Sequence, residues 1–184
     1  MIDTLKIFSK KAKHIAKGEQ YYFCTLHRAE NVDNKKVFKE IVAALEIIAL
    51  DAAIYLPLHP RTKKMAQKFG LMNQLKQACH VLPVLNYAKS VSYQKYAKLI
   101  LTDSGGVQEE ASYLGIPCLT LRTETERPIT VTRGTNIVAG VTKKSILKAY
   151  HGVNFKKKKT NIKYWDGFTA KRIVSSLKKE LQTN

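Results

Sequence analysis

Polar residues suited to binding an anion follow several apolar runs of the sequence. The clearest segment is 103–110, Asp-Ser-Gly-Gly-Val-Gln-Glu-Glu, which follows the apolar run 99–102 and opens a helical pattern. Gly105 and Gly106 let the backbone approach a ligand, and the free N–H groups and dipole of a helix start favour a phosphate. Ser104 adds a hydroxyl donor. The alternative is that Ser104 only caps the helix.

The carboxylate of Glu110 is a second candidate ligand group, one helical turn beyond Gly106. At that distance it can accept hydrogen bonds from two adjacent ribose hydroxyls. The alternative makes Glu109 and Glu110 acids of the first turn that interact only with the helix dipole. The Gly-Gly pair favours a ligand, because a helix cap does not require it.

A histidine follows an earlier apolar run, in the segment 25–31, Thr-Leu-His-Arg-Ala-Glu-Asn. An imidazole at this place can hold a phosphate oxygen or act as acid or base near neutral pH, so His27 is the catalytic candidate. Arg28 and Glu30 are candidates for substrate binding. A purely structural histidine explains the pattern equally well.

Two further segments carry candidate groups. In His-Pro-Arg-Thr at 59–62, the proline fixes the turn, Thr62 is expected to cap the next helix, and His59 is expected to contribute to the wall of the site. In Arg-Thr-Glu-Thr-Glu-Arg-Pro at 122–128, Arg127 could clamp a phosphate or a sugar group. A surface ion-pair loop accounts for that spacing equally well.

Strand and helix patterns alternate along the chain and would position these residues. Expected strands cover 21–26, 54–58, 79–84, 99–102, 116–121 and 135–138, and expected helices cover 1–17 (ended by Gly18), 37–50, 62–69, 71–77, 92–97 and 103–113. The alternation predicts an α/β fold with a single Rossmann-like, doubly wound parallel sheet. Ligands bind beyond the carboxyl ends of such strands, so the candidate segments should meet at one edge.

Length and charge narrow the class of protein. The 184 residues suit one α/β unit rather than two full domains. The formal charge is +18, from 32 Lys and Arg against 14 Asp and Glu, and residues 141–184 hold twelve of those cations. A solvated lysine-rich surface is favoured, with no nucleic acid or membrane partner, because neither an RNP-type signature nor exposed aromatics accompany the charge.

Cysteine usage and hydropathy predict a cytoplasmic protein. Cys24, Cys79 and Cys118 lie in apolar runs without metal-ligand spacing, which is typical of buried thiols in a reducing compartment. No apolar run approaches the ~20 residues that span a bilayer, and the N-terminus lacks a secretion signal. We therefore expect no metal site and no export.

Five stretches in register resemble the non-hydrolysing UDP-N-acetylglucosamine 2-epimerase family. They are T-L-H-R-A-E-N at 25–31, P-L-H-P-R-T at 57–62, L-T-D-S-G-G-V-Q-E-E-A at 101–111, L-G-I-P-C-L-T-L-R at 114–122 and T-E-R-P at 125–128. The resemblance implies the second domain of a glycosyltransferase-B-like fold. It also implies interconversion of UDP-GlcNAc and UDP-ManNAc by elimination and re-addition of UDP, with no cofactor.

The resemblance also assigns roles to the candidate residues. It implies phosphate binding by Ser104, Gly105 and Gly106, ribose binding by Glu110, contact with the phosphate or sugar by Arg127, and contact with the departing diphosphate by His27. Ser90 departs from the family pattern, because an aromatic residue that faces the uracil is common there. We therefore expect weaker stacking on the base.

Only the second half of the family's length is matched, so we expect the catalytic first domain to be missing and this chain alone to bind UDP weakly with little or no turnover. The expected organisation is a linker helix at 1–18, a UDP-binding domain at 19–150, and a basic loop with a C-terminal helix at 151–184. An exposed apolar face on the linker helix would favour self-association as a homodimer. A separate polypeptide that supplies the first domain is the other expected partner. The alternatives are the donor-binding half of a UDP-sugar glycosyltransferase and a non-enzymatic UDP-sugar-binding module.

Overall fold

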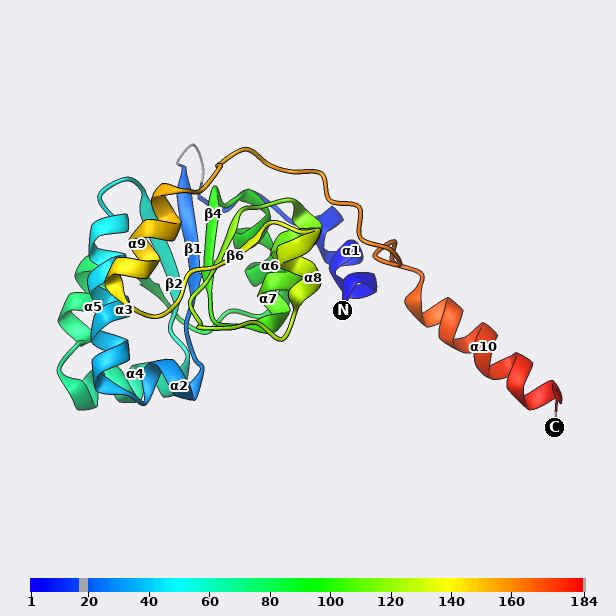
Figure 1. The fold of residues 1–184 in the computed structure, drawn as a ribbon, viewed down its shortest axis with the longest axis horizontal. Coiled ribbons are helices and arrows are strands. Elements are labelled where there is room, and N and C mark those ends of the chain that lie inside the picture. The colour runs from blue at the N-terminus through cyan, green and yellow to red at the C-terminus, as the bar shows by residue number, and fades with distance from the viewer. Residues whose placement is uncertain (17–19, 184) are drawn as a thin grey trace.

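Six parallel strands form one sheet in the computed structural model, which describes residues 1–16 and 20–183 (Figure 1). The strands are β1 (Tyr21–Thr25), β2 (Ala53–Pro57), β3 (His80–Leu82), β4 (Leu99–Thr102), β5 (Cys118–Thr120) and β6 (Asn136–Val138). Their order across the sheet is β3-β2-β1-β4-β5-β6, which is the Rossmann order. The predicted Rossmann-like, doubly wound parallel sheet is therefore confirmed.

Helices cover both faces of this sheet. They are α1 (Ile2–Lys11), α2 (Ala29–Val32), α3 (Lys35–Ile48), α4 (Pro60–Phe69), α5 (Met72–Ala78), α6 (Tyr87–Tyr96), α7 (Gly105–Leu114), α8 (Pro128–Thr132), α9 (Lys143–His151) and α10 (Thr169–Thr183). α3, α5 and α9 pack on one face, and α6 and α7 pack on the other, where α1 contacts both.

The central strand β1 shows why the sequences of the strands are continuous apolar runs. Tyr22 and Cys24 belong to the core under α3, α5 and α9, whereas Tyr21 and Phe23 belong to the core under α6 and α7. Successive side chains of a strand point to opposite faces. Because helices bury both faces, no alternation of polar and apolar residues remains.

The chain leaves β1 and β4 toward opposite sides of the sheet, and this is the switch point of the fold. Thr25 and Thr102 pair at the ends of these strands, and their hydroxyls share a hydrogen bond of 2.6 Å. One connection leads through α2 and α3 to β2, and the other through α7 to β5. A ligand site is expected beyond such a pair of strand ends.

The structure differs from the predicted elements mainly in its helices. α1 ends at Lys11 rather than at residue 17, because Ala12 is extended, and the predicted end at Gly18 lies outside the described residues. The apolar pattern does not predict α9, although Thr142 and Ser145 form a capping box at its start. α2 and α8 have four and five residues, too few to produce a period.

Apolar side chains are left exposed on α10 more than on α1. Ile2 and Leu5 of α1 are buried against Val91 of α6, so the expected exposed face of the N-terminal helix is largely covered, although Ile7 is exposed. α10 extends away from the rest of the chain (Figure 1). Its exposed aliphatic residues, which we call the α10 stripe, are Ile173, Val174, Leu177 and Leu181.

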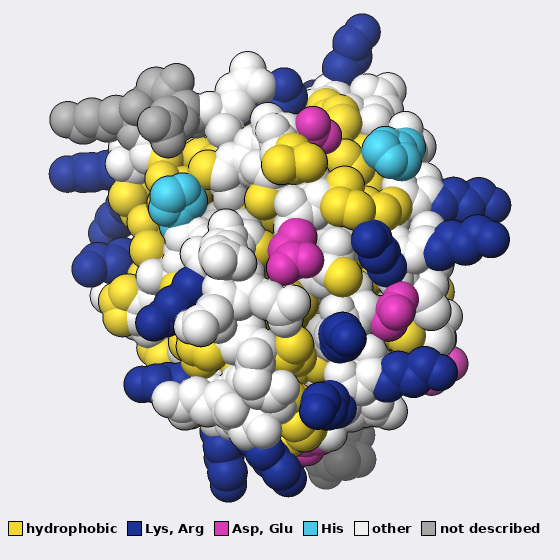
Figure 2. Space-filling model, turned by 90° about the vertical axis from the view of Figure 1, so that its left-hand side faces the viewer, with side chains coloured by type: hydrophobic (Ala, Val, Ile, Leu, Met, Phe, Trp, Pro, Cys, Tyr) yellow, Lys and Arg dark blue, Asp and Glu magenta, His cyan; other side chains and the backbone are white. Residues whose placement is uncertain are grey.

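The positive charge is distributed rather than concentrated on the face seen in Figure 2. Lys and Arg side chains stand around the edge of this face and over its lower part, with white and yellow surface between them. This distribution agrees with the predicted solvated lysine-rich surface.

The cysteine prediction is confirmed, because Cys24, Cys79 and Cys118 are all buried and free. Within the described residues, none of the helices combines the length and the hydropathy that crossing a bilayer requires.

Candidate functional site

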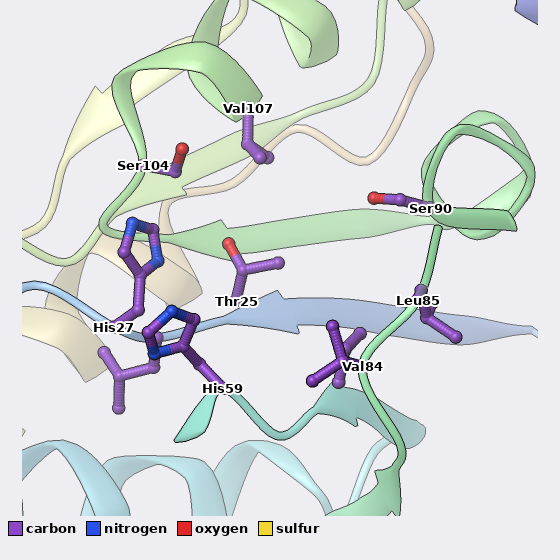
Figure 3. Close-up of a pocket in the computed structure, with 10 residues that line it drawn as sticks. Thr25, His27, His59, Val84, Leu85, Ser90, Ser104 and Val107 are labelled. Carbon is purple, nitrogen blue, oxygen red and sulfur yellow. The ribbon is translucent and has the colours of Figure 1, made fainter. Parts of the chain in front are cut away.

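A pocket of about 170 Å³ lies beyond the ends of β1, β2 and β4, at the switch point (Figure 3). Of the predicted site residues, His27, His59 and Ser104 line it. The remaining wall consists of Thr25, Leu26, Pro57, Val84, Leu85, Ser90 and Val107. Sites for whole small molecules usually measure about 300–1,000 Å³, so this pocket would hold one part of a larger ligand.

His27 is held in place by the carboxylate of Asp103. The imidazole Nδ1 lies 3.2 Å from Asp103 Oδ1, and the backbone N–H of His27 donates to Oδ2 at 2.9 Å. Asp103 is fully buried, and burial raises its pKa, while the backbone N–H of Arg28 and the imidazole of His27 oppose that shift. This arrangement fixes the ring at the pocket edge (Figure 3).

His59 caps α4 and faces His27. Its Nδ1 accepts a hydrogen bond of 3.2 Å from the backbone N–H of Arg61, so a neutral His59 carries its proton on Nε2. The prediction that Thr62 caps this helix is wrong, because its buried hydroxyl donates to the carbonyl of Leu26 instead. The rings of His27 and His59 lie 5.4 Å apart, centroid to centroid, and form one side of the pocket (Figure 3).

The first turn of α7 has the form of an anion site. Ser104 is the N-cap residue but makes no side-chain cap hydrogen bond, so the simple capping interpretation does not account for its hydroxyl. Neither Gly105 nor Gly106 has a positive φ. A Cβ on Gly105 would have only the Arg127 side chain nearby, at 3.8 Å. The backbone shape therefore does not require glycine at 105, whereas close approach of a ligand would.

Glu110 is set back from the pocket, in the packing between α6 and α7. Its Oε2 accepts a hydrogen bond of 2.7 Å from Gln94, and its side chain is almost fully buried. Burial raises the pKa of Glu110, against the effect of the Gln94 hydrogen bond. No acid lies in the first turn of α7, so the alternative that Glu109 and Glu110 serve the helix dipole is wrong.

Arg28 and Glu30 belong to a cluster of charges at the ends of β1 and β5. Arg122 joins the two segments, because its Nε lies 3.1 Å from Glu30 Oε1 and its Nη1 lies 3.3 Å from Glu126 Oε1. Arg28 Nη2 lies 3.6 Å from Glu126 Oε2. The hydrogen bond from Arg122 lowers the pKa of Glu126, and the charge of Arg28 adds to this effect.

Arg127 is both ion-paired and close to the helix start. Its Nε lies 3.3 Å from Glu109 Oε1, and its Nη1 donates to the carbonyl of Glu126 at 3.2 Å. The side chain also passes 3.8 Å from the position of a Cβ on Gly105. An anion on the first turn of α7 would therefore meet a guanidinium that is already oriented.

Sequence reasoning missed the central place of Asp103. It is the first residue of the Asp-Ser-Gly-Gly segment and directly follows a fully buried strand, which was the available signal. The hydrophobic wall formed by Val84 and Leu85 was missed as well, because no polar motif marks it. In the described part of the chain, no group of three or more His, Cys, Asp or Glu side chains could hold a metal ion.

Comparison with known proteins identifies relatives over most of the chain. Residues 1–178 match the sequence model of a family described as UDP-N-acetylglucosamine 2-epimerase. The UDP-N-acetylglucosamine 2-epimerase of Methanocaldococcus jannaschii is 45% identical over 163 residues, which cover 86% of this chain and 44% of that protein. A Methanococcus maripaludis protein of the same name is 38% identical over 95% of this chain and 50% of its own length.

Solved structures agree with these relatives. The M. jannaschii epimerase in complex with UDP-GlcNAc and UDP has a TM-score of 0.80 at 40% identity, covering 95% of this chain and 48% of that one. The Neisseria meningitidis epimerase bound to UDP-GlcNAc has a TM-score of 0.81 at 29% identity, covering 97% and 53%. An Escherichia coli heptosyltransferase with ADP, at 15% identity and a TM-score of 0.57, shares the fold alone. The chain thus spans about half the length of the relatives it matches.

Proposed function

Because the chain belongs to the UDP-N-acetylglucosamine 2-epimerase family, we propose that it is the nucleotide-sugar-binding half of an isomerase that interconverts UDP-GlcNAc and UDP-ManNAc. The observation that carries this proposal is the uncapped first turn of α7, which opens beside a pocket with two histidines. The M. jannaschii relative, solved with UDP-GlcNAc and UDP, supports the same ligand class.

In this proposal the UDP diphosphate binds on the first turn of α7. The N–H groups of Gly105 and Gly106 and the hydroxyl of Ser104 would donate to its oxygens, as helix N-termini do with phosphates. His59 would donate from Nε2, because its Nδ1 already accepts from Arg61. Hydrogen bonds to a charged phosphate are each worth roughly 1.5–3 kcal/mol, so a few of them suffice for measurable binding.

The nucleoside would extend from the diphosphate toward α6. Val84, Leu85 and Ser90 form the far wall of the pocket and are proposed to meet the base (Figure 3). Glu110 is proposed to accept from the ribose hydroxyls. The side chain of Met1 borders this turn, because its Cε lies 3.3 Å from the position of a Cβ on Gly106.

The chemistry requires UDP to leave C1 of the sugar and return after C2 has lost and regained a proton. His27 is proposed as the residue that contacts the departing diphosphate, with Arg28, Glu30 and Arg127 as the charged rim toward the sugar. Acid and base groups at C2 typically contribute ~10²- to 10⁴-fold each, and we assign them to the half of the relatives that this chain does not span. A one-domain site also leaves the reaction open to water.

The proposed organisation keeps a linker segment at 1–18, which contains α1, the UDP-binding domain at 19–150 and the basic C-terminal segment at 151–184. We propose that a separate first-domain polypeptide covers the α10 stripe, whose side chains are exposed by half or more. A second copy of this chain is the alternative cover. A cytoplasmic location is also part of the proposal, supported by three buried free thiols.

Calorimetric titration of the chain with UDP tests the proposal. We expect saturable binding of UDP, weaker binding of uridine, and a reduced affinity for UDP in the Ser104→Ala variant. Adding a first-domain polypeptide from a relative should then yield UDP-ManNAc from UDP-GlcNAc. Transfer of sugar to an acceptor would instead favour a glycosyltransferase, and tight UDP binding without turnover in that mixture would favour a binding module. If the titration shows no binding of UDP, the epimerase half, the glycosyltransferase half and the binding module are all refuted.

A further inference from the structure

We propose that Asp103 is the positioning residue for His27, and that it fixes the imidazole with its proton on Nδ1 and with Nε2 free for a ligand. The consequence for binding rests on the proposed function, in which His27 meets the UDP diphosphate. The tautomer itself can be measured without any nucleotide.

The carboxylate of Asp103 connects the end of β4 with the loop after β1. Its Oδ2 accepts from the backbone N–H of His27 at 2.9 Å and of Arg28 at 2.8 Å, and from the side-chain amide of Asn31 at 3.3 Å. Its Oδ1 lies 3.2 Å from His27 Nδ1. Two backbone N–H groups, one side-chain amide and the imidazole Nδ1 therefore converge on one side chain that has no exposure to solvent. A buried carboxylate persists only with such partners.

The chemistry of the two groups determines the tautomer. An ionised carboxylate only accepts hydrogen bonds, so His27 must present an N–H at Nδ1. In the neutral ring the lone pair then lies on Nε2, and in the charged ring Nε2 carries the second proton. In both states Nε2 is the atom left for a ligand in the pocket, and Asp103 itself contacts no ligand.

Asp103 is not needed as a helix cap, which removes the simplest structural role for it. The N-cap position of α7 belongs to Ser104. The side-chain bonds of Asp103 all run to residues more than 70 positions earlier in the chain. Its side chain therefore serves the His27 loop and not its own helix.

The test is the Asp103→Asn variant of the full 184-residue chain. The amide oxygen of Asn can still accept from the backbone N–H groups, but its NH₂ would face Nδ1, so the ring should change to the Nε2–H tautomer. In 15N NMR without nucleotide, we expect a pyrrole-type Nδ1 signal for His27 in the wild type and a pyridine-type signal in the variant. We expect UDP affinity to fall by about 10- to 100-fold, as when one charge-assisted hydrogen bond is lost.

The matched control is Asn31→Ala, which removes another hydrogen bond to the same carboxylate and leaves the contact between Asp103 and Nδ1 intact. We expect it to keep the wild-type tautomer and to bind UDP within about threefold of the wild type, a difference below 1 kcal/mol. An Nε2–H tautomer in the wild type would overturn the inference. So would an Asp103→Asn variant that keeps the wild-type tautomer. A tautomer change in Asp103→Asn with unchanged UDP affinity would support the positioning role and refute the proposed contact of His27 with the diphosphate.

Two further results separate this inference from the proposed function. If the wild type does not bind UDP, the proposed function fails, and the tautomer signals of wild type and variant alone decide whether Asp103 positions His27. If circular dichroism shows that Asp103→Asn does not fold, the wild-type signal and the Asn31→Ala control decide instead.

Discussion

The substitution Gly105→Ala should separate the stability of this chain from its proposed binding of a phosphate. The new methyl group would have only the flexible Arg127 side chain within 4 Å, at 3.8 Å, which is an ordinary van der Waals contact. Because Gly105 has no positive φ, alanine fits its backbone. A compatible Gly→Ala change stabilises a protein by about 0.4–1 kcal/mol through the unfolded state. We therefore expect the melting temperature to stay the same or rise by about 1–4 °C.

The same methyl group would occupy space at the residue whose N–H is proposed to bind the diphosphate, on the side of the Arg127 side chain. Losing one hydrogen bond to a charged ligand costs about 1.5–3 kcal/mol, which corresponds to a roughly 10- to 100-fold weaker UDP affinity. Thermal unfolding by circular dichroism and titration calorimetry measure the two effects on one sample. Opposite directions of stability and affinity are the expected signature.

Gly152→Ala is the matched control, because Gly152 also has a negative φ and its nearest neighbour would be the Ala149 carbonyl at 3.5 Å. It does not line the pocket of His27 and His59. The control should share any gain in stability and leave UDP binding unchanged. Wild-type affinity in Gly105→Ala would refute the placement of the phosphate on α7.

Three further predictions concern other parts of the chain. Burial raises the pKa of Glu110 above its ordinary value of 4.5, so the unfolded chain loses this proton first, and stability falls as the pH rises from about 4.5 through the folded value. Melting temperatures of the Glu110→Gln variant, measured between pH 4 and 7, should lack this decline, and the variant should bind UDP more weakly. A pH profile identical to that of the wild type would contradict the burial argument. Leu177→Lys should change the melting temperature little, because the side chain is exposed. It should weaken any self-association of the chain measured by sedimentation. Unchanged association would exclude the α10 stripe as the surface through which the copies contact each other. Tyr150→Phe removes hydrogen bonds with Asp51 at 2.6 Å and Tyr22 at 2.9 Å, so chemical denaturation should show a loss of about 1–2 kcal/mol, and no loss would mean that water replaces both partners.

Most strands could be predicted because they lie in short runs of apolar residues, and the run at 99–102 matches β4 completely. The ends of the helices were harder to predict, because they depend on which side chains form the capping hydrogen bonds. At α4 both Thr62 and His59 are chemically able to cap, and only the three-dimensional structure shows that the Thr62 hydroxyl is used by Leu26.

The candidate site was predictable where its residues lie next to each other in the sequence, and not where they meet through the fold. The turn at 104–106 is visible in the sequence as a serine and two glycines after a strand. The link of Asp103 to His27 spans 76 positions, and that of Arg122 to Glu30 spans 92. Such contacts are set by the register of β1, β4 and β5, which no local spacing reveals.

The projecting C-terminal helix has a consequence for how long this polypeptide survives in a cell. Four exposed aliphatic side chains on a single projecting helix present the kind of surface that chaperones and degradative proteases recognise. We expect the half-life of the chain to be short when it is made alone and to lengthen when whatever covers α10 is made with it. The steady-state amount of the chain would then depend on how much of the polypeptide that covers α10 is present, independently of transcription.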